Sequence, residues 1–334
     1  MRWKEMFTTI DAHVAGQPLR LVTFGVPQIP VAPVRDQIAR FQEKHDHIRR
    51  WLLAEPRGHA GLTGAVLFPS LSSEIDYGVV FMSAGGYKPM SGHGMIALAT
   101  ILIDSGTVPI NGPDTRITFD TYSGPIQARA SVDQGRVRNV RFRNVPSFRL
   151  HKQIEITVKD RRIPVDIAYG GNWYAIARAE DAGVSLEADT SKALSEMGVR
   201  ISQEVGNQFD LVHPVDPELS GIFGTVFLGE PRSDDSDNRN ATVYLDGLID
   251  RSPCATGMAA TMASLAADGK LDVSQPYVSE SLVDTYLTGR IVNNTTVGDH
   301  PGIIVEIAGR GQVTGTHTFY VDPSDSLADG FVLF

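Results

Sequence analysis

The chain has 334 residues, of which 42% are hydrophobic and 21% are charged, and its formal net charge at pH 7 is −9. This length allows two domains of ordinary size, and the composition excludes a mostly disordered chain. The acidic balance argues against nucleic acid or an anionic membrane as a partner, because both attract clustered lysine and arginine.

The single cysteine, Cys254, excludes an internal disulfide and a cysteine-based zinc site. A lone cysteine is normal in a reducing compartment, so we expect a cytoplasmic protein. The first residues lack the apolar run of a signal peptide, and no stretch approaches the roughly eighteen apolar residues of a membrane span. The nine histidines have no zinc-like spacing, and we predict no metal site.

The first part of the chain predicts strands followed by two helices. Residues 7–14 and 19–24 are β-branched or apolar and predict two strands, separated by glycine and proline. Residues 34–53 carry apolar side chains at helical spacing with charges between them, which predicts an amphipathic helix. Short strands then lead to an apolar helix that begins at Ser91.

The second part of the chain repeats this order of elements. Residues 116–148 alternate between apolar and polar side chains and predict an antiparallel meander, and more strands follow over residues 154–167. Residues 189–208 predict a second amphipathic helix. Residues 241–245 predict the strand that leads to the loop before Cys254.

The two apolar helices begin with similar sequence motifs. Residues 91–98 (Ser-Gly-His-Gly-Met-Ile-Ala-Leu) match residues 254–261 (Cys-Ala-Thr-Gly-Met-Ala-Ala-Thr), and the likeness continues without a gap. We therefore predict two similar α/β halves. The first comprises residues 1–123 plus 312–334 and carries Ser91; the second comprises residues 124–311 and carries Cys254.

Backbone N–H groups at a helix N-terminus are unpaired and bind carboxylates. If the two helix starts face each other across one pocket, Ser91 and Cys254 stand on opposite sides of a small anion. The same helix field lowers the pKa of a thiol. We therefore expect Cys254 to be a thiolate base at neutral pH.

Three neighbouring features have two interpretations each. Asp250 binds an ammonium group or only holds a turn. His93 hydrogen-bonds a ligand or Asp250, or it only caps and packs the helix. Residues 169–174 (Tyr-Gly-Gly-Asn-Trp-Tyr) wall a pocket, or they form a plain strand–turn–strand corner.

Residues 90–94 (Met-Ser-Gly-His-Gly) and 250–257 (Asp-Arg-Ser-Pro-Cys-Ala-Thr-Gly) resemble the signatures of the proline racemase superfamily, and the likeness covers nearly the whole chain. The resemblance implies the diaminopimelate epimerase type of fold: two pseudo-symmetric α/β halves, each a curved sheet around a central helix, with the active site in the cleft between them. The C-terminal strand returns to the first half in this fold. Members work without a cofactor.

The resemblance also implies roles for individual residues. Ser91 and Cys254 take the places of the acid/base pair. The N–H groups near Gly92, His93, Ala255 and Thr256 would bind a carboxylate, and Asp250 with His93 would hold a ring amine. The expected partner is a small cyclic amino acid, and a homodimer is an allowed assembly.

Ser91 stands where racemases and epimerases have cysteine, and it is a poor partner in the proton exchange that inverts an α-carbon. Dehydration of trans-3-hydroxy-L-proline needs only one effective acid/base residue, because the α-hydrogen and the 3-hydroxyl lie on one ring face. Residues 55–59 and 76–82 also resemble trans-3-hydroxy-L-proline dehydratases. We expect this dehydratase; the alternatives are a 4-hydroxyproline 2-epimerase or proline racemase, and a silent binding protein. The base is either Ser91, activated by His93, or Cys254.

Overall fold

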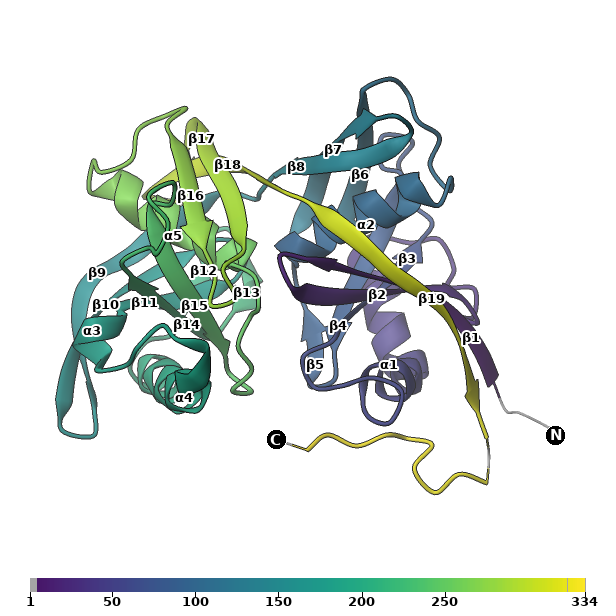
Figure 1. The fold of residues 1–334 in the computed structure, drawn as a ribbon, viewed down its shortest axis with the longest axis horizontal. Coiled ribbons are helices and arrows are strands. Elements are labelled where there is room, and N and C mark those ends of the chain that lie inside the picture. Colours follow the sequence, from purple (N-terminus) through teal and green to yellow (C-terminus); the bar gives the residue numbers. More distant parts are fainter. Residues whose placement is uncertain (1–4, 323, 334) are drawn as a thin grey trace. The chain divides into compact units, whose positions relative to one another are not determined.

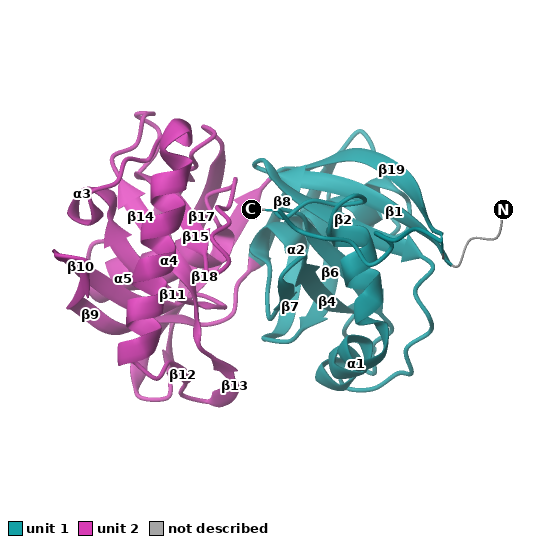
Figure 2. Cartoon of the chain, turned by 90° about the horizontal axis from the view of Figure 1, so that it is seen from below, with its two compact units in different colours: residues 1–142, 310–334 teal, residues 143–309 magenta. Residues whose placement is uncertain are grey.

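The computed structural model describes residues 5–322 and 324–333, which form two compact units. Unit 1 comprises residues 1–142 and 310–334, and unit 2 comprises residues 143–309 (Figure 2). The sequence placed the first boundary at residues 123/124, inside a hairpin. Strand pairing keeps that hairpin and the strand after it in unit 1. Residues 1–4, 323 and 334, which the predicted first half includes, lie outside the described residues.

The strands of unit 1 pair in the order β19–β1–β2–β3–β4–β6–β7–β8. The C-terminal strand β19 lies along β1 (Figure 1), which confirms that the end of the chain returns to the first half. Their bounds are β1 Glu5–Val14, β2 Gln17–Phe24, β3 Thr63–Phe68, β4 Tyr77–Ser83, β5 Gly86–Lys88, β6 Asp114–Thr121, β7 Gly124–Asp133, β8 Arg136–Arg143 and β19 Gly311–Val321.

The strands of unit 2 close into a ring. They pair in the order β9–β10–β11–β14–β15–β16–β17–β18, and β18 pairs again with β9. Their bounds are β9 Ser147–Val158, β10 Arg161–Tyr169, β11 Trp173–Arg178, β14 Ile222–Gly229, β15 Asn238–Tyr244, β16 Pro276–Glu280, β17 Tyr286–Val297 and β18 His300–Gly309, and a separate hairpin joins β12 Val212–His213 to β13 Asp216–Ser220.

Each unit holds one outer helix and one central helix, which join parallel strands as crossovers must. The amphipathic helix α1 (Val34–Leu53) lies in the connection between the parallel strands β2 and β3. The amphipathic helix α4 (Ser191–Gln208) lies in the connection between the parallel strands β11 and β14. The apolar helices α2 (Gly92–Asp104) and α5 (Ala255–Ala267) are buried along almost their whole length. Helix α2 packs against β1, β2, β7 and β19, and α5 packs against β9, β10, β11, β17 and β18. The short helix α3 (Ala179–Ala182) follows β11.

The two units share one local hydrogen-bond pattern. Asp76 donates its backbone N–H to the carbonyl of Thr118 and accepts the N–H of Thr118 on its carboxylate. Asp237 makes the same two bonds with Val278. Counting along the strands from these aspartates makes Ser83 at the end of β4 equivalent to Tyr244 at the end of β15.

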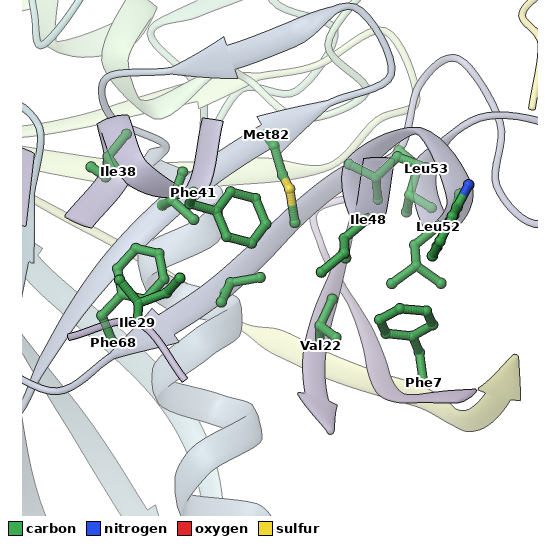
Figure 3. Packing of buried hydrophobic residues seen from close by; sticks show 14 of the residues in the cluster. Phe7, Val22, Ile29, Ile38, Phe41, Ile48, Leu52, Leu53, Phe68 and Met82 are labelled. Atoms are coloured by element: carbon green, nitrogen blue, oxygen red, sulfur yellow. The ribbon is translucent and has the colours of Figure 1, made fainter. Parts of the chain in front are cut away.

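Buried side chains fill the space between the outer helix and the sheet of unit 1 (Figure 3). Phe41 and Ile48 from α1 meet Val22 of β2 and Phe68 of β3 in this core. Burying such side chains supplies the main driving force for holding α1 on the sheet. Among residues 5–322 and 324–333, no helix is long and apolar enough to cross a membrane.

Candidate active site

Ser91 begins helix α2 as its N-cap. Its backbone is extended, with φ −142° and ψ 107°, and its Oγ accepts a 3.3 Å hydrogen bond from the N–H of Gly94. Serine is favoured here because its short side chain can satisfy an N–H that the helix leaves unpaired. The hydroxyl is therefore held over the first turn of α2, where it is 4% exposed.

His93 follows Ser91 by two residues and lies in the first turn of α2. Its Nδ1 is 3.4 Å from Ser91 Oγ, and the residue is 5% exposed. The structure brings Ser91, Gly92 and His93 together at one end of α2, as the sequence predicted. The contact makes the imidazole a neighbour of the hydroxyl and of the first-turn N–H groups.

Cys254 begins helix α5, but its backbone differs from that of Ser91. Its φ of 53° lies in the left-handed region, which residues other than glycine rarely adopt. Its carbonyl accepts the N–H of Met258 at 2.7 Å, so it serves as the first residue of the helical hydrogen-bond ladder. Strained backbone of this kind collects at functional sites.

Two buried hydroxyls lie around the sulfur of Cys254. Tyr174 Oη and Thr256 Oγ1 are each 3.7 Å from Sγ, and they are 2.7 Å from each other. Thr256 belongs to the first turn of α5, whereas Tyr174 comes from β11. Residues 169–174 form a strand–turn–strand corner between β10 and β11, and the corner also supplies a wall beside the cysteine.

Asp250 is 2% exposed and organises the loop before Cys254. Its Oδ1 accepts hydrogen bonds from the backbone N–H of Ser252 at 2.9 Å and from the Ser252 hydroxyl at 2.8 Å. Its Oδ2 accepts a 2.5 Å bond from the hydroxyl of Tyr244. The Ser252 hydroxyl oxygen in turn accepts the N–H of Cys254 at 3.1 Å. A chain of hydrogen bonds thus runs from Asp250 to the cysteine.

The expected low pKa of Cys254 is wrong. Burial raises the pKa of the thiol to about 11, and the negative charge of Asp250 adds to the rise. Hydrogen bonds from the Gly257 N–H, Tyr174 and Thr256 lower it by less. Before substrate binds, the residue is therefore a neutral thiol at pH 7.

Tyr244 is a functional candidate that sequence reasoning missed, and Tyr174 was predicted only as part of a possible pocket wall. Burial raises the pKa of both phenols well above the ordinary value, so both stay neutral donors. Tyr174 is the last residue of the Tyr-Gly-Gly-Asn-Trp-Tyr motif at residues 169–174. Nothing in the sequence marked Tyr244, because its partner Asp250 meets it only through the turn after β15.

The described residues contain no group of three or more histidine, cysteine, aspartate or glutamate side chains that could hold a metal ion. The side chains at the starts of α2 and α5 supply hydroxyls, a thiol and an imidazole, and the loop before α5 supplies a carboxylate. Ser91, Gly92 and His93 gather in unit 1, and Asp250, Cys254, Ala255 and Thr256 gather in unit 2.

The sequence profile of the family described as "Proline racemase" matches residues 9–332. The chain belongs to the proline racemase family. A trans-3-hydroxy-L-proline dehydratase of Bacillus thuringiensis subsp. konkukian is 36% identical over 333 residues, covering 100% of both chains. A 4-hydroxyproline 2-epimerase of Streptosporangium roseum is 38% identical over 336 residues, again covering 100% of both.

A solved structure of the proline racemase family agrees with the fold. The crystal structure of a hydroxyproline epimerase from Agrobacterium vitis, with bound trans-4-hydroxy-L-proline, matches with a TM-score of 0.92 at 31% identity. The match covers 100% of this chain and 97% of that chain. These relatives are thus named as a dehydratase and as epimerases that concern hydroxylated proline, and further relatives are named as proline racemases.

Proposed function

We propose that this protein dehydrates trans-3-hydroxy-L-proline to 1-pyrroline-2-carboxylate without a cofactor. The observation that carries the proposal is the unequal pair of helix starts, serine at α2 and cysteine at α5. Inversion needs one group to remove a proton and another to deliver one, whereas elimination on a single ring face needs only one effective acid/base. The 36% identity to a dehydratase supports the same reaction.

The first-turn N–H groups of each apolar helix are proposed as carboxylate-binding groups. These groups belong to Gly92 and His93 in α2 and to Ala255 and Thr256 in α5. Helix N-termini favour anions because their N–H groups are unpaired and carry the positive end of the helix dipole. The ring ammonium is proposed to lie against Asp250, which is a buried carboxylate with acceptor capacity left on Oδ2.

Cys254 is proposed to carry the proton chemistry. The thiolate takes the α-proton, the 3-hydroxyl leaves with that proton as water, and the thiolate is restored. The enamine product then tautomerises to 1-pyrroline-2-carboxylate. An ammonium bound against Asp250 cancels the charge that helps to raise the pKa of the Cys254 thiol, so substrate binding itself favours the thiolate.

A second function, 4-hydroxyproline 2-epimerase, is supported by one contact. The 3.4 Å approach of His93 Nδ1 to Ser91 Oγ offers a way to activate the serine as the second acid/base. The relative named as an epimerase at 38% identity points the same way. In the dehydratase, this activated serine is the alternative base for the α-proton.

The deciding experiment incubates the protein with trans-3-hydroxy-L-proline, trans-4-hydroxy-L-proline and L-proline, and follows pyrroline formation and optical rotation together. We expect pyrroline from the first substrate, and no activity from Cys254→Ala. A change in optical rotation without formation of any pyrroline would overturn the dehydratase proposal in favour of the epimerase. If a substrate raises the thermal stability of the protein and none of the three is turned over, the protein is a binding protein.

Ser91→Cys tests whether the difference between serine at α2 and cysteine at α5 decides the reaction. A second thiol restores two comparable acid/base groups, so we expect the variant to gain α-proton exchange and inversion of trans-4-hydroxy-L-proline in deuterated water. Ser91→Ala is the control, because it removes the hydroxyl without adding an acid. Equal inversion by the wild type and Ser91→Cys would contradict the argument.

A further inference from the structure

The sulfur of Cys254 has two hydroxyl neighbours that also bond to each other. Tyr174 Oη and Thr256 Oγ1 are 2.7 Å apart, and each lies 3.7 Å from Sγ. All three residues are buried, with exposed fractions of 0% for Tyr174, 5% for Thr256 and 3% for Cys254. The three polar atoms form a triangle from which bulk water is largely excluded.

The fold places the phenol there through a glycine corner. A side chain at Gly170 would begin 2.2 Å from the carbonyl oxygen of Thr256, so only glycine allows the corner before β11 to touch the first turn of α5. The ring of Tyr174 then packs edge-on against Phe223, with ring centroids 5.9 Å apart. The hydroxyl is thereby aimed at the start of α5 by packing on both sides.

We propose that Tyr174 and Thr256 act as a rotatable hydroxyl pair that positions Cys254 and reverses its hydrogen bonds with the protonation state of the sulfur. Each hydroxyl has one proton to donate and two lone pairs that accept. Beside a thiolate, Tyr174 donates to Thr256 and Thr256 donates to the sulfur. Beside a thiol, the sulfur donates and the hydroxyl protons turn away, so no heavy atom needs to move.

Such a hydroxyl pair can hydrogen-bond with both states of a group that takes and returns a proton within one turnover. This is the role given to Cys254 in the proposed function. A hydrogen bond to an ionised group is worth more than one to a neutral group, so the pair selectively stabilises the thiolate. Such chains also polarise one another in a buried setting. Tyr174 and Thr256 are therefore positioning residues that act on the reaction through the sulfur.

The serine side lacks this pair. The strand registers align Tyr174 with Gly224 and Tyr244 in unit 2, and Leu19 with Thr63 and Ser83 in unit 1. Since Ser83 is equivalent to Tyr244, Leu19 occupies the position of Tyr174. His93 likewise occupies the position of Thr256, two residues after the first residue of its motif. The hydroxyl pair therefore accompanies the cysteine alone.

The test measures alkylation of Cys254 by iodoacetamide as a function of pH in the full-length protein. Cys254 is the single cysteine of the chain, so the mass of the peptide that contains it follows this thiol without interference from another. For Tyr174→Phe we expect an apparent thiol pKa higher by about one unit, and alkylation about tenfold slower below that pKa, because Thr256 loses the donor that polarises its own hydrogen bond to the thiolate. Thr256→Val should shift the profile in the same direction.

Two further variants separate positioning from general damage. Thr256→Ser keeps the hydroxyl and should restore the wild-type profile. Tyr277→Phe makes the same chemical change at another buried tyrosine, on β16, and should leave the profile unchanged. If Tyr174→Phe does not fold, as judged by circular dichroism and thermal melting, the contrast between Thr256→Val and Thr256→Ser decides the question.

Wild-type profiles in both Tyr174→Phe and Thr256→Val would overturn the proposal. A shift in Thr256→Val alone, with Tyr174→Phe folded and unchanged, would also overturn it, because the phenol would then play no part. The assay contains no substrate, so a wrong assignment of the reaction leaves its outcome intact. A failure of the hydroxyl pair therefore differs from a failure of the proposed function.

Discussion

The hydroxyl of Tyr244 donates a 2.5 Å hydrogen bond to Oδ2 of Asp250, and both residues are buried. The bond ties the end of β15 to the loop that carries Cys254. Removing it leaves a buried carboxylate oxygen without this donor, so we expect Tyr244→Phe to lower the free energy of unfolding by about 1.5–3 kcal/mol. Urea denaturation measures this change.

The same variant should reduce kcat/KM by about tenfold, mostly through KM, because Asp250 is the proposed partner of the substrate ammonium. Tyr286→Phe is the control, since this tyrosine on β17 is 44% exposed. An unchanged KM in Tyr244→Phe would remove Asp250 from the proposed binding site or show that its position does not depend on the phenol.

The raised pKa of Cys254 makes stability depend on alkaline pH. The unfolded thiol titrates near 9.0 and the folded thiol near 11, so the folded state keeps its proton longer. The stabilising contribution is fully present below pH 9 and is lost as pH rises from 9 towards 11. It amounts to about 2–3 kcal/mol at most. Denaturation of wild type and Cys254→Ala at pH 8, 9 and 10 should show a steeper loss in the wild type, and parallel curves would refute this pKa.

The pH dependence of turnover distinguishes the two candidate bases. If the Cys254 thiolate takes the α-proton, kcat/KM should rise by about tenfold per pH unit from pH 6.5 to 9, because kcat/KM reports the free enzyme. The high pKa of the Cys254 thiol places this whole range below its titration. A flat profile in the same range, together with loss of activity in His93→Gln, would assign the base to Ser91.

Gly94 keeps room for Ser91 at the start of α2. An added methyl group would lie 2.5 Å from Cε1 of Phe81 and 2.9 Å from Ser91 Oγ. We expect Gly94→Ala to cost about 1–3 kcal/mol through overpacking, and to reduce activity by displacing the hydroxyl. Gly206→Ala in α4 is the matched control, because its nearest neighbour would be 3.4 Å away. That change should stabilise the protein by about 0.5–1 kcal/mol through helix propensity.

A buried ion pair joins β15 to β16 in unit 2. Arg239 pairs with Glu280, whose side chain is completely buried and also accepts the N–H groups of Arg232 and Ser233. We expect Glu280→Gln to cost about 3–5 kcal/mol, because the guanidinium is left buried without its full counter-charge. Glu230→Gln should cost below about 1 kcal/mol, since the pair of Glu230 with Arg178 is exposed. Similar losses in both variants would contradict this difference.

Local pattern was enough to predict much of the fold. Helix α1 has the bounds that its apolar periodicity predicted, Val34–Leu53, and α4 begins two residues after its predicted start at 189. The alternation over residues 116–148 corresponds to the antiparallel strands β6, β7 and β8. These predictions succeeded because side-chain period is set by neighbours along the chain. The domain boundary was misplaced because it depends on which strand pairs with which.

The sequence by itself determined the two unequal helix starts at Ser91 and Cys254 and, through the motifs around them, the family, since both lie in short contiguous segments. Only the tertiary structure decided what surrounds the cysteine. Tyr174 reaches it from 80 positions earlier in the chain, and Tyr244 reaches Asp250 across a turn. Burial then raised the pKa of the Cys254 thiol instead of lowering it, because desolvation of a charge depends on every segment packed around it and outweighed the hydrogen bonds from the Gly257 N–H, Tyr174 and Thr256.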